Sequence, residues 1–311
     1  MSKLPQDFIK TAKMCGIEHA LGANSYLYIE KNKIISELKG EGIEFHSKET
    51  GKGAEAEIRI KSGVKIEEPL FFCFGILGKK DEQFIIPNIV LEDGAEVKII
   101  AHCSFPHAQG ATHNMEAEFT IGKNAKFFYD EHHYHGKSSG AKVYPKLNLN
   151  IKEGGEFNSN FVLTQGTVGE VGIEIEGNLG KKAKAALESK VLGKSAQDII
   201  NITEKINLNG AESKSLIKMR AAAKNGGRVL MQGETYAAGR DSMGHVDCQE
   251  IVVGKNSSAR AVPIVEVSND QARVTHEASV GKINQKELET LMTRGMDEEE
   301  ATELIIASMM K

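Results

Sequence analysis

The sequence predicts an all-β core that folds as a β-solenoid, with a short helical segment at the N-terminus and two helices at the C-terminus. Three observations lead to this prediction. A turn-and-strand pattern recurs along the chain, the residues between turns alternate between apolar and polar, and no helix signal separates one copy from the next. Each coil of such a repeat buries its inner side chains only against neighbouring coils, as a solenoid does.

The repeat consists of an apolar residue, two further residues, a Gly or Asn, a small residue and then a strand-like run. Clear copies span Ile60–Ile66, Leu91–Val97, Ile121–Phe127 and Ile151–Phe157, and weaker ones span Leu179–Ala183, Asn207–Ala211 and Val253–Ser257. The turn positions 63, 94, 124, 154, 182 and 210 follow one another at nearly constant intervals. Gly and Asn tolerate a positive φ angle, so each copy predicts a tight turn. A further corner is expected at Gly226-Gly227, one such interval before Asn256.

A β-sandwich built from regular hairpins is the alternative fold. The dipeptides Asp93-Gly94 and Asn209-Gly210 are typical of two-residue hairpin turns. The alternation in segments such as Glu96–Ile100 and Asn148–Ile151 indicates strands in either fold. The regular spacing favours the solenoid.

The two ends of the chain differ from the repeats. Residues 5–15 are weakly helical, whereas the C-terminus is clearly so: Asn284–Glu287 and Asp297–Glu300 are capping-box patterns, and Gly295 ends the first helix. We therefore divide the chain into an N-terminal segment (1–50), a β-helix core (51–280) and a C-terminal helical segment (281–311). The two helices either cap the open edge of the sheet or form a docking surface.

Composition limits the function classes. The chain has 311 residues with a net charge of −4, so nothing indicates non-specific binding to nucleic acid or membranes. No apolar run is long enough for a membrane helix, and the first residues lack the apolar core of a secretion signal, which predicts a cytoplasmic protein. There the four cysteines should be reduced, and we expect Cys15 and Cys73 to be structural.

Nucleotide and nucleic-acid binding are poorly supported. Gly193-Lys194-Ser195 resembles the end of a phosphate-binding P-loop, but Glu188 stands where the motif needs Gly. The sequence also has no basic patch with interleaved aromatic residues, which nucleic-acid binding would favour.

Histidine and cysteine cluster between residues 102 and 135. The cluster contains His102, Cys103, His107, His113, His132, His133 and His135. Zinc or iron could use such ligands, although no compact metal-binding spacing is present. Because alternate residues of a strand point to opposite faces, His133 and His135 should share one face and His132 the other.

A second group lies near the C-terminus. Cys248 precedes one strand-like run, and His276-Glu277 follows another. Since Cys248 and His276 are as far apart in the sequence as the turn positions 182 and 210, we expect them to stack on neighbouring coils. The alternative is a buried Cys248 and a His276 that caps the helical region.

These residues resemble the SufB/SufD family of iron–sulfur cluster assembly proteins. The similar segments are Pro263–Gly281, Leu291–Ala301, Asn225–Arg228 with Gly233, His245–Cys248, and His102–Pro106 with Tyr129–His135. Together they extend over residues 85–311.

The resemblance implies a right-handed parallel β-helix that pairs with a second β-helix, a nascent cluster at their interface, and a SufC-like ABC-type ATPase docked on the C-terminal helices. Cys248, His276 and Glu277 are implied as cluster ligands, and Cys103 as a sulfur acceptor. The expected ATPase-docking residues are Leu288, Leu291, Met292, Arg294, Gly295, Leu304 and Ile305.

The sequence is much shorter than bacterial SufB and most resembles short archaeal SufB-like proteins that work without SufD. This implies a homodimer that holds a transient cluster of the [4Fe–4S] type and exchanges material with a sulfur donor and with apo-protein recipients. We therefore expect a scaffold rather than an enzyme, with ATP hydrolysis in the partner.

Two other functions stay open at this point. The first is a metal-free structural adaptor of an ABC-type ATPase. The second is a carbohydrate-active β-helix enzyme, which the lack of Trp and the 6% aromatic content disfavour.

Overall fold

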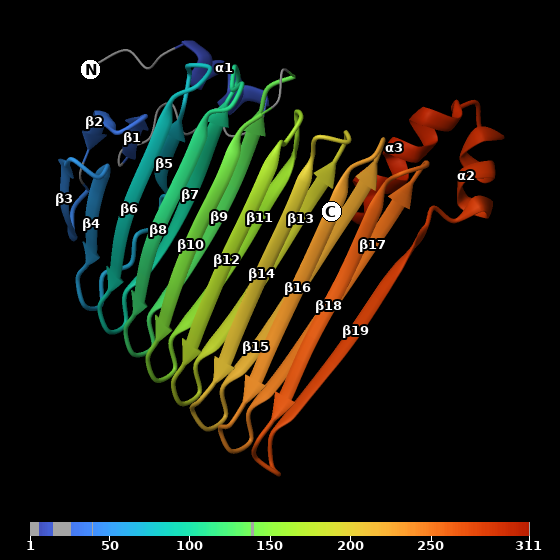
Figure 1. Cartoon of the computed structure of the whole chain (residues 1–311). Coiled ribbons are helices and arrows are strands. Elements are labelled where there is room, and N and C mark those ends of the chain that lie inside the picture. Colours follow the sequence, from blue (N-terminus) through green and yellow to red (C-terminus); the bar gives the residue numbers. More distant parts are fainter. Residues whose placement is uncertain (1–5, 15–25, 39, 138–139, 311) are drawn as a thin grey trace.

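The computed structural model describes residues 6–14, 26–38, 40–137 and 140–310. Two long sheets lie face to face and are joined by short corners (Figure 1). From β5 onward the chain passes from one sheet to the other with every strand, so neighbouring strands in a sheet belong to successive coils. The predicted β-solenoid is confirmed.

The ten strands of the first sheet (sheet A) are, in spatial order, β2 (Lys33–Leu38), β1 (Tyr26–Glu30), β5 (Leu70–Gly75), β7 (Glu96–Phe105), β9 (Lys126–His135), β11 (Glu156–Gln165), β13 (Lys184–Gly193), β15 (Lys214–Lys224), β17 (Met243–Val253) and β19 (Arg273–Lys282). The nine strands of the second sheet (sheet B) are β3 (Ile43–Glu49), β4 (Ala54–Ile60), β6 (Glu82–Leu91), β8 (Thr112–Ile121), β10 (Lys142–Ile151), β12 (Glu170–Leu179), β14 (Ile199–Leu208), β16 (Arg228–Ala237) and β18 (Ser258–Val267).

Strand direction excludes the β-sandwich. Among the described strands, only β1 with β2 and β3 with β4 pair antiparallel, and all these strands lie before the regular coils. Every later pair is parallel, for example β7 with β9 and β17 with β19. A parallel pair cannot be joined by a two-residue hairpin, because the chain must cross over before it returns. Here the crossover is the strand of the opposite sheet.

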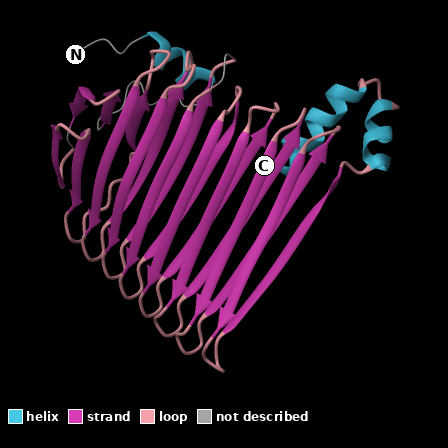
Figure 2. Ribbon diagram, viewed as in Figure 1, coloured by secondary structure: helices cyan, strands magenta, loops and turns pink. Residues whose placement is uncertain are grey.

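The corners between sheet B and sheet A repeat one backbone turn (Figure 2). Positive φ angles occur at the predicted positions 63, 94, 124, 154 and 182. The prediction at Gly210 is wrong, since Glu212 takes the left-handed conformation there, with φ of 59°. Gly210 instead accepts the hydrogen bond that closes the turn from Ser213 N at 3.3 Å, as Gly180 does from Ala183 N at 3.1 Å. The corner expected at Gly226 is confirmed by its φ of 88°.

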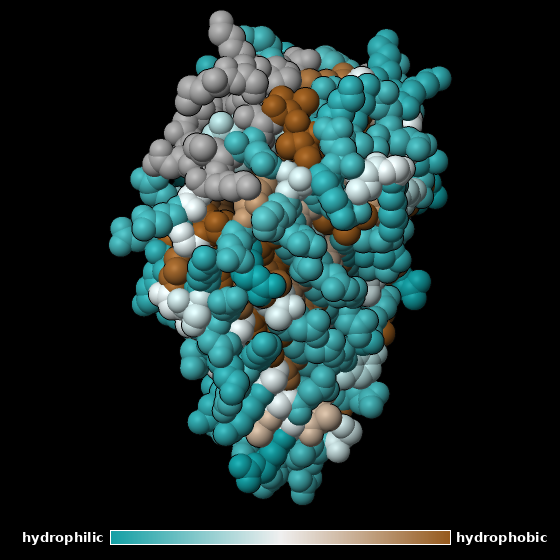
Figure 3. Space-filling view, turned by 90° about the vertical axis from the view of Figure 1, so that its left-hand side faces the viewer, coloured by the Kyte–Doolittle hydropathy of each residue, from teal (hydrophilic) through white to brown (hydrophobic). Residues whose placement is uncertain are grey.

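The core is the space between the sheets, which we call the lumen. Aliphatic side chains fill most of it, and an aromatic group lies in its middle: Phe119 packs 5.2 Å from Phe127 and 5.3 Å from Tyr129, and Phe127 packs 5.5 Å from Phe157 (ring centroids). Such pairs are worth about 0.5–1.5 kcal/mol each beyond the area that they bury. Figure 3 views the molecule from the β3–β4 end, where hydrophilic residues cover most of the surface.

Three helices lie at the ends of the solenoid. Helix α1 (Gln6–Met14) packs on the outer face of β7, where Ser104 Oγ donates a hydrogen bond to Thr11 Oγ1 at 2.9 Å. Helices α2 (Gln285–Met292) and α3 (Glu298–Met309) follow β19. Asn284 caps α2, and the capping box of Asp297 and Glu300 is confirmed. No helix among the described residues is both long and apolar enough to cross a membrane.

The C-terminal helices leave the last coil uncovered. Helix α3 lies beside sheet A (Figure 1). It packs against the outer face of the sheet, where Ile306 clusters with Leu192 and Ala222. The last strand, β19, is exposed along almost its whole length. The alternative that the helices cap the open edge is therefore wrong for the described residues.

Candidate functional site

Two groups of buried polar side chains lie in the lumen. A strand sends alternate side chains to opposite faces. On β7 and β9 the odd-numbered residues face the lumen, and on β17 the even-numbered ones do, as their burial patterns show. Polar residues at these positions are the exceptions in an otherwise apolar interior.

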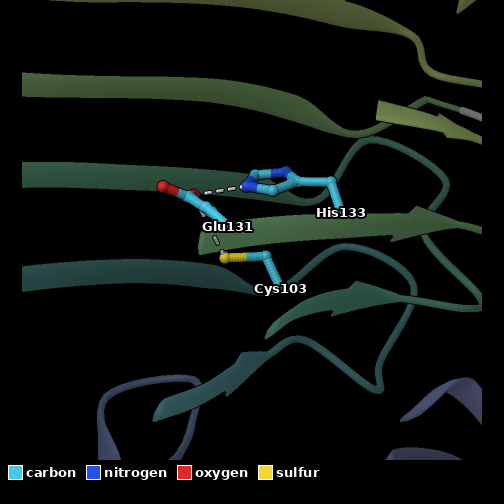
Figure 4. Close-up of side chains that lie close together, drawn as sticks. All are labelled: Cys103, Glu131 and His133. Carbon is cyan, nitrogen blue, oxygen red and sulfur yellow. Dashed lines mark hydrogen bonds and ion pairs between the residues drawn. The ribbon is translucent and has the colours of Figure 1, made fainter. Parts of the chain in front are cut away.

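The first group consists of Cys103 on β7 and Glu131 and His133 on β9 (Figure 4). Cys103 lies opposite His133 in the strand register. His133 Nε2 is 2.6 Å from Glu131 Oε1, and Cys103 Sγ is 3.7 Å from the same oxygen. One ligating atom from each residue lies within 4.8 Å of the others. We call these three residues the lumen triad.

Burial and charge act on the lumen triad in opposite directions. Burial, and then the neighbouring Glu131 carboxylate, raise the pKa of the Cys103 thiol well above its ordinary value. Burial also acts to raise the pKa of Glu131, but the hydrogen bond and charge of His133, helped by His113 and Tyr129, outweigh it and hold that pKa below its ordinary value. The triad therefore combines a neutral thiol with an ionised carboxylate.

Two further histidines surround the triad. His113 Nδ1 lies 2.7 Å from Gln83 Oε1, and His135 Nδ1 lies 2.9 Å from the carbonyl oxygen of Val168. An oxygen acceptor at Nδ1 fixes the proton there, so the lone pair of each ring is on Nε2. Both Nε2 atoms are buried and have no hydrogen-bond partner among the described residues.

The structure thus divides the predicted histidine cluster. His113, His133 and His135 face the lumen around Phe105, with ring centroids 5.3, 6.0 and 5.1 Å from it. In contrast, His102 and His132 lie opposite each other on the other face of sheet A. The prediction that His133 and His135 share a face, with His132 on the other, is confirmed.

The second group lies four strands further along sheet A. Cys248 and Glu250 follow each other on the inner face of β17, each 1% exposed. Burial, and then Glu250 and Glu204, raise the pKa of Cys248 to about 12. Burial raises the pKa of Glu250 to about 7, and neither of its carboxylate oxygens has a partner among the described residues. We call Cys248 and Glu250 the thiol–carboxylate pair.

A third buried carboxyl group, that of Glu204, lies in the lumen between these two groups. Glu204 on β14 accepts a hydrogen bond from Ser189 Oγ, and burial raises its pKa to about 7. A cavity of about 30 Å³, enough for a water molecule, is lined by both Glu131 and Glu204. The interior between the two cysteines is therefore partly polar.

The predicted stacking of Cys248 on His276 is wrong. The register between β17 and β19 places Cys248 opposite Ala278 and His276 opposite Val246. His276 still points to the same face as Cys248, because its partner Val246 is two residues before Cys248 on β17. Glu277 lies opposite Asp247 and therefore points to the other face. Within one chain, the three predicted ligands do not converge on one point.

Glu131, Glu204 and Glu250 are the site residues that the sequence analysis missed. Each stands at a position where the alternation calls for an apolar residue, as in Tyr129-x-Glu131-x-His133. An acidic residue in register with the buried positions of a strand was the signal that could have found them. Cys15 lies outside the described residues, and Cys73 is buried against Tyr28, which fits the structural part expected of it.

A groove opens between the C-terminal helices and β17. It has a volume of about 620 Å³ and is lined by Gln249, Ile251, Lys286, Glu287, Thr290, Leu291, Leu304, Ile305, Ser308 and Met309. Of the expected docking residues, Leu291, Leu304 and Ile305 line the groove, whereas Leu288 is buried beneath it. Met292, Arg294 and Gly295 lie at the end of α2, outside the groove lining.

Comparison with known proteins finds relatives along most of the chain. A family model described as the SufBD core domain of the SUF system for FeS cluster assembly matches residues 77–309. An iron–sulfur cluster assembly SufBD family protein of Methanocaldococcus jannaschii is 38% identical over 93% of this chain and 90% of its own length. One of Pyrococcus horikoshii is 33% identical over 97% and 92%. A Staphylococcus aureus relative is 28% identical over 80% of this chain but only 53% of its own length.

Proposed function

The chain belongs to the SufBD family of iron–sulfur cluster assembly proteins, and from this membership we propose that it is a scaffold that holds a nascent cluster at the open end of its solenoid. The cluster is the cargo of the scaffold. The observation that carries the proposal is the thiol–carboxylate pair, which lies one strand inside the uncovered edge.

The ligands of this site suit a scaffold. Cysteine thiolate is the usual ligand of iron–sulfur clusters, and carboxylate and imidazole bind iron less firmly. Cys248 supplies the thiolate, and Glu250, whose two oxygens have no partner among the described residues, supplies a carboxylate. His276 faces the same side from the edge strand. Mixed ligation of this kind holds a cluster loosely enough to be handed to a recipient protein.

The open edge also supports a homodimer. Strands β18 and β19, ten residues each, end the two sheets, and neither has a further strand beside it among the described residues. Long uncovered edges are templates for pairing with another chain. A two-fold axis at this edge would bring Glu277 and His276 of one copy toward the other copy. The three predicted ligands, which lie on two faces in one chain, would then contribute to a site formed by both.

The groove beside α2 and α3 is where we place a SufC-like ABC-type ATPase. It is mostly apolar, with Lys286 and Glu287 at one side, and it contacts the outer face of β17 through Ile251. A movement of the helices on ATP binding would therefore act directly on the strand that carries Cys248. Cys103 remains our candidate sulfur acceptor, although it is fully buried here and the lumen would have to open for a donor to reach it.

The decisive experiment is the iron and acid-labile sulfide content per chain after anaerobic co-expression with the ATPase. Wild type is compared with Cys248→Ala, with Glu250→Gln and with the matched control Cys73→Ala, which removes a buried thiol on the other face. We expect Cys248→Ala to lose the cluster and Cys73→Ala to keep it.

Equal iron in wild type and Cys248→Ala would overturn the site. A stable ATPase complex that contains no iron in any variant would instead support a metal-free adaptor, the second function that the family membership allows.

A further inference from the structure

We propose that the lumen triad of Cys103, Glu131 and His133 is a binding site for one divalent transition-metal ion, separate from the cluster site at Cys248. The ion is of the class that thiolate, carboxylate and imidazole bind together, namely Zn²⁺ or Fe²⁺. This inference does not depend on the proposed scaffold function.

The geometry of the triad is close to that of a metal site. Zinc binds thiolate at about 2.3 Å and imidazole or carboxylate at about 2.0–2.2 Å, so ligating atoms around one ion lie within about 4 Å of each other. In this structure they lie within 4.8 Å of one another, with His133 Nε2 2.6 Å and Cys103 Sγ 3.7 Å from the same carboxylate oxygen. Small side-chain rotations would open room for the ion between them.

The surroundings give independent support. Nδ1 of His133 and Nε2 of His113 and His135 are all buried without a hydrogen-bond partner among the described residues. A hydrogen-bonded network that served packing alone would satisfy these atoms, because a bare buried polar atom costs about 1–3 kcal/mol. Nδ1 of His113 is held by Gln83 Oε1 at 2.7 Å. Nε2 of His113 therefore has no donor beside it among the described residues, on a ring that Gln83 holds in place 6.5 Å from the His133 ring (centroids), just outside the triad.

An apolar shell surrounds the triad. Phe105 and Phe161 pack against the His133 ring, with centroids 6.0 and 4.9 Å away, and exclude bulk water from it. When the ion binds, the Cys103 thiol proton leaves to solvent. The proton on His133 Nε2 also leaves to solvent, so that the Nε2 lone pair faces the metal and Nδ1 keeps its own proton. The bound protein then contains one M²⁺, one thiolate, one carboxylate and neutral imidazoles.

The test measures metal binding to the purified full-length chain in the absence of sulfide. Co²⁺ serves as the spectroscopic probe, because a thiolate ligand produces a charge-transfer band in the near ultraviolet. Zn²⁺ and anaerobic Fe²⁺ are titrated separately, and bound metal per chain is determined by mass spectrometry. The arms of the experiment therefore identify which ion binds more tightly.

We expect one ion per wild-type chain and a thiolate–Co²⁺ band. Cys103→Ser should lose the band, and both Glu131→Gln and His133→Gln should weaken binding by more than about tenfold. His102→Gln, which changes a buried histidine on the other face, and Cys248→Ala should bind like wild type. The ion should also raise the melting temperature of the wild type but not of Cys103→Ser, since a ligand of the folded state stabilises it.

Two results would overturn the inference. One is the absence of any stoichiometric ion in the folded wild type. The other is a thiolate–Co²⁺ band that persists in Cys103→Ser and disappears in Cys248→Ala. If Cys103→Ser does not fold, the isosteric Glu131→Gln variant decides. Loss of cluster assembly in Cys248→Ala with the lumen ion retained would separate this site from the scaffold site.

Discussion

At the scale of single residues, buried carboxyl groups distinguish this lumen from an ordinary β-solenoid core. Glu131 is 7% exposed and Glu204 and Glu250 are each 1% exposed, although burying a charge without a partner is costly. Glu131 offsets this cost through His133, whereas Glu204 accepts a hydrogen bond from the hydroxyl group of Ser189. Glu131, whose pKa is held below its ordinary value, should therefore respond to pH differently from Glu204 and Glu250, whose pKa values burial raises to about 7.

Glu204 should make the protein less stable as the pH rises. Burial raises its folded-state pKa from 4.5 to about 7, so the folded state binds a proton between these values that the unfolded state has lost. Stability from this group is full below pH 4.5 and is lost by pH 8, by roughly 3 kcal/mol at most. Glu204→Gln keeps the acceptor for Ser189 and should flatten this slope, which urea unfolding at pH 5 and pH 8 measures. An unchanged slope in the variant would show that Glu204 is not the group responsible.

Glu250 should contribute to cluster retention without being essential for the fold. Because its carboxylate oxygens have no partner among the described residues and Cys248 is two residues away on the same face, we expect Glu250→Gln to bind a cluster that is lost faster to a chelator. The measurement is the rate of bleaching of the cluster absorption after addition of the chelator. Glu174→Gln is the control, since that carboxylate is exposed on β12, where it pairs with Lys146 at 2.9 Å, and belongs to no proposed ligand set. Equal rates in wild type and Glu250→Gln would exclude Glu250 as a ligand.

Cysteines and histidines were found from the sequence because these residue types are rare and carry chemistry wherever they stand. Glutamate is common on surfaces, so Glu131 and Glu250 were recognised only when the structure showed which face of each strand is buried. The predicted pairing of Cys248 with His276 failed because the sequence does not give the register between strands. A shift of one residue moves a side chain to the other face of the sheet. A shift of two residues keeps the face but changes the residue opposite, and here Ala278 instead of His276 lies opposite Cys248.

At the scale of elements, the corners of the solenoid determine the register. Several corners place a residue other than Gly at the positive φ angle, among them Lys182, Glu212 and Asp241. A left-handed conformation costs an L-residue with a side chain roughly 1–2 kcal/mol. The corner hydrogen bond, as from Ser213 N to the carbonyl oxygen of Gly210, holds the backbone there in spite of this cost.

Replacing Glu212 with Gly should therefore stabilise the protein. Relief of the left-handed strain outweighs the greater flexibility of Gly in the unfolded chain, and we expect a net gain of about 0.5–1 kcal/mol in the free energy of unfolding. The ion pair of Glu212 with Lys182 is exposed and long, at 3.8 Å, so its loss matters little. The control is Lys214→Gly, two residues later on β15, which should destabilise by a similar amount. Denaturant unfolding compares them, and a destabilised Glu212→Gly would contradict the strain argument.

The sequence predicted the elements well where they repeat and poorly where they do not. The turn pattern predicted most of the corners from Gly63 to Lys182, and the capping pattern predicted α3. The strands β1 to β3 before the regular coils carry no copy of the repeat, so they were not expected. The coils differ in length by a few residues, because individual corners and strands are longer in some coils than in others. No short sequence pattern predicts these differences.

At the scale of the whole molecule, the solenoid is open at its C-terminal end. In a closed barrel every strand has two neighbours, but here β18 and β19 have one each among the described strands. Helix α3 lies against the outer face of sheet A and leaves this edge free. The arrangement separates two surfaces, the groove beside the C-terminal helices and the open edge at the end of the solenoid.

The groove should be the docking surface for the ATPase. Leu304 is 44% exposed and lines the groove, so Leu304→Asp should prevent co-purification with the ATPase because it places a charge in an apolar contact. The matched control is Leu216→Asp, since Leu216 is 40% exposed on the outer face of β15. Pull-down with the tagged ATPase makes the comparison. Retention of the complex by Leu304→Asp would place the docking surface elsewhere.

The open edge should hold the two copies of a dimer together. Val280 is 49% exposed, lies on the edge strand β19 and points to the same face as Cys248. A charge at this position would therefore lie both at the proposed contact with the second copy and beside the cluster site. We expect Val280→Lys to convert the dimer to a monomer, because lysine on an edge strand opposes pairing with another chain. Leu216→Lys is the control for adding a charge at an exposed leucine. Light scattering gives the mass of each variant, and a Val280→Lys protein that is still dimeric would show that the copies meet elsewhere. If the variant is a monomer that still binds the cluster, one chain alone supplies all the ligands. The carboxylate ligand would then be Glu250 of the same chain rather than Glu277 of a second copy.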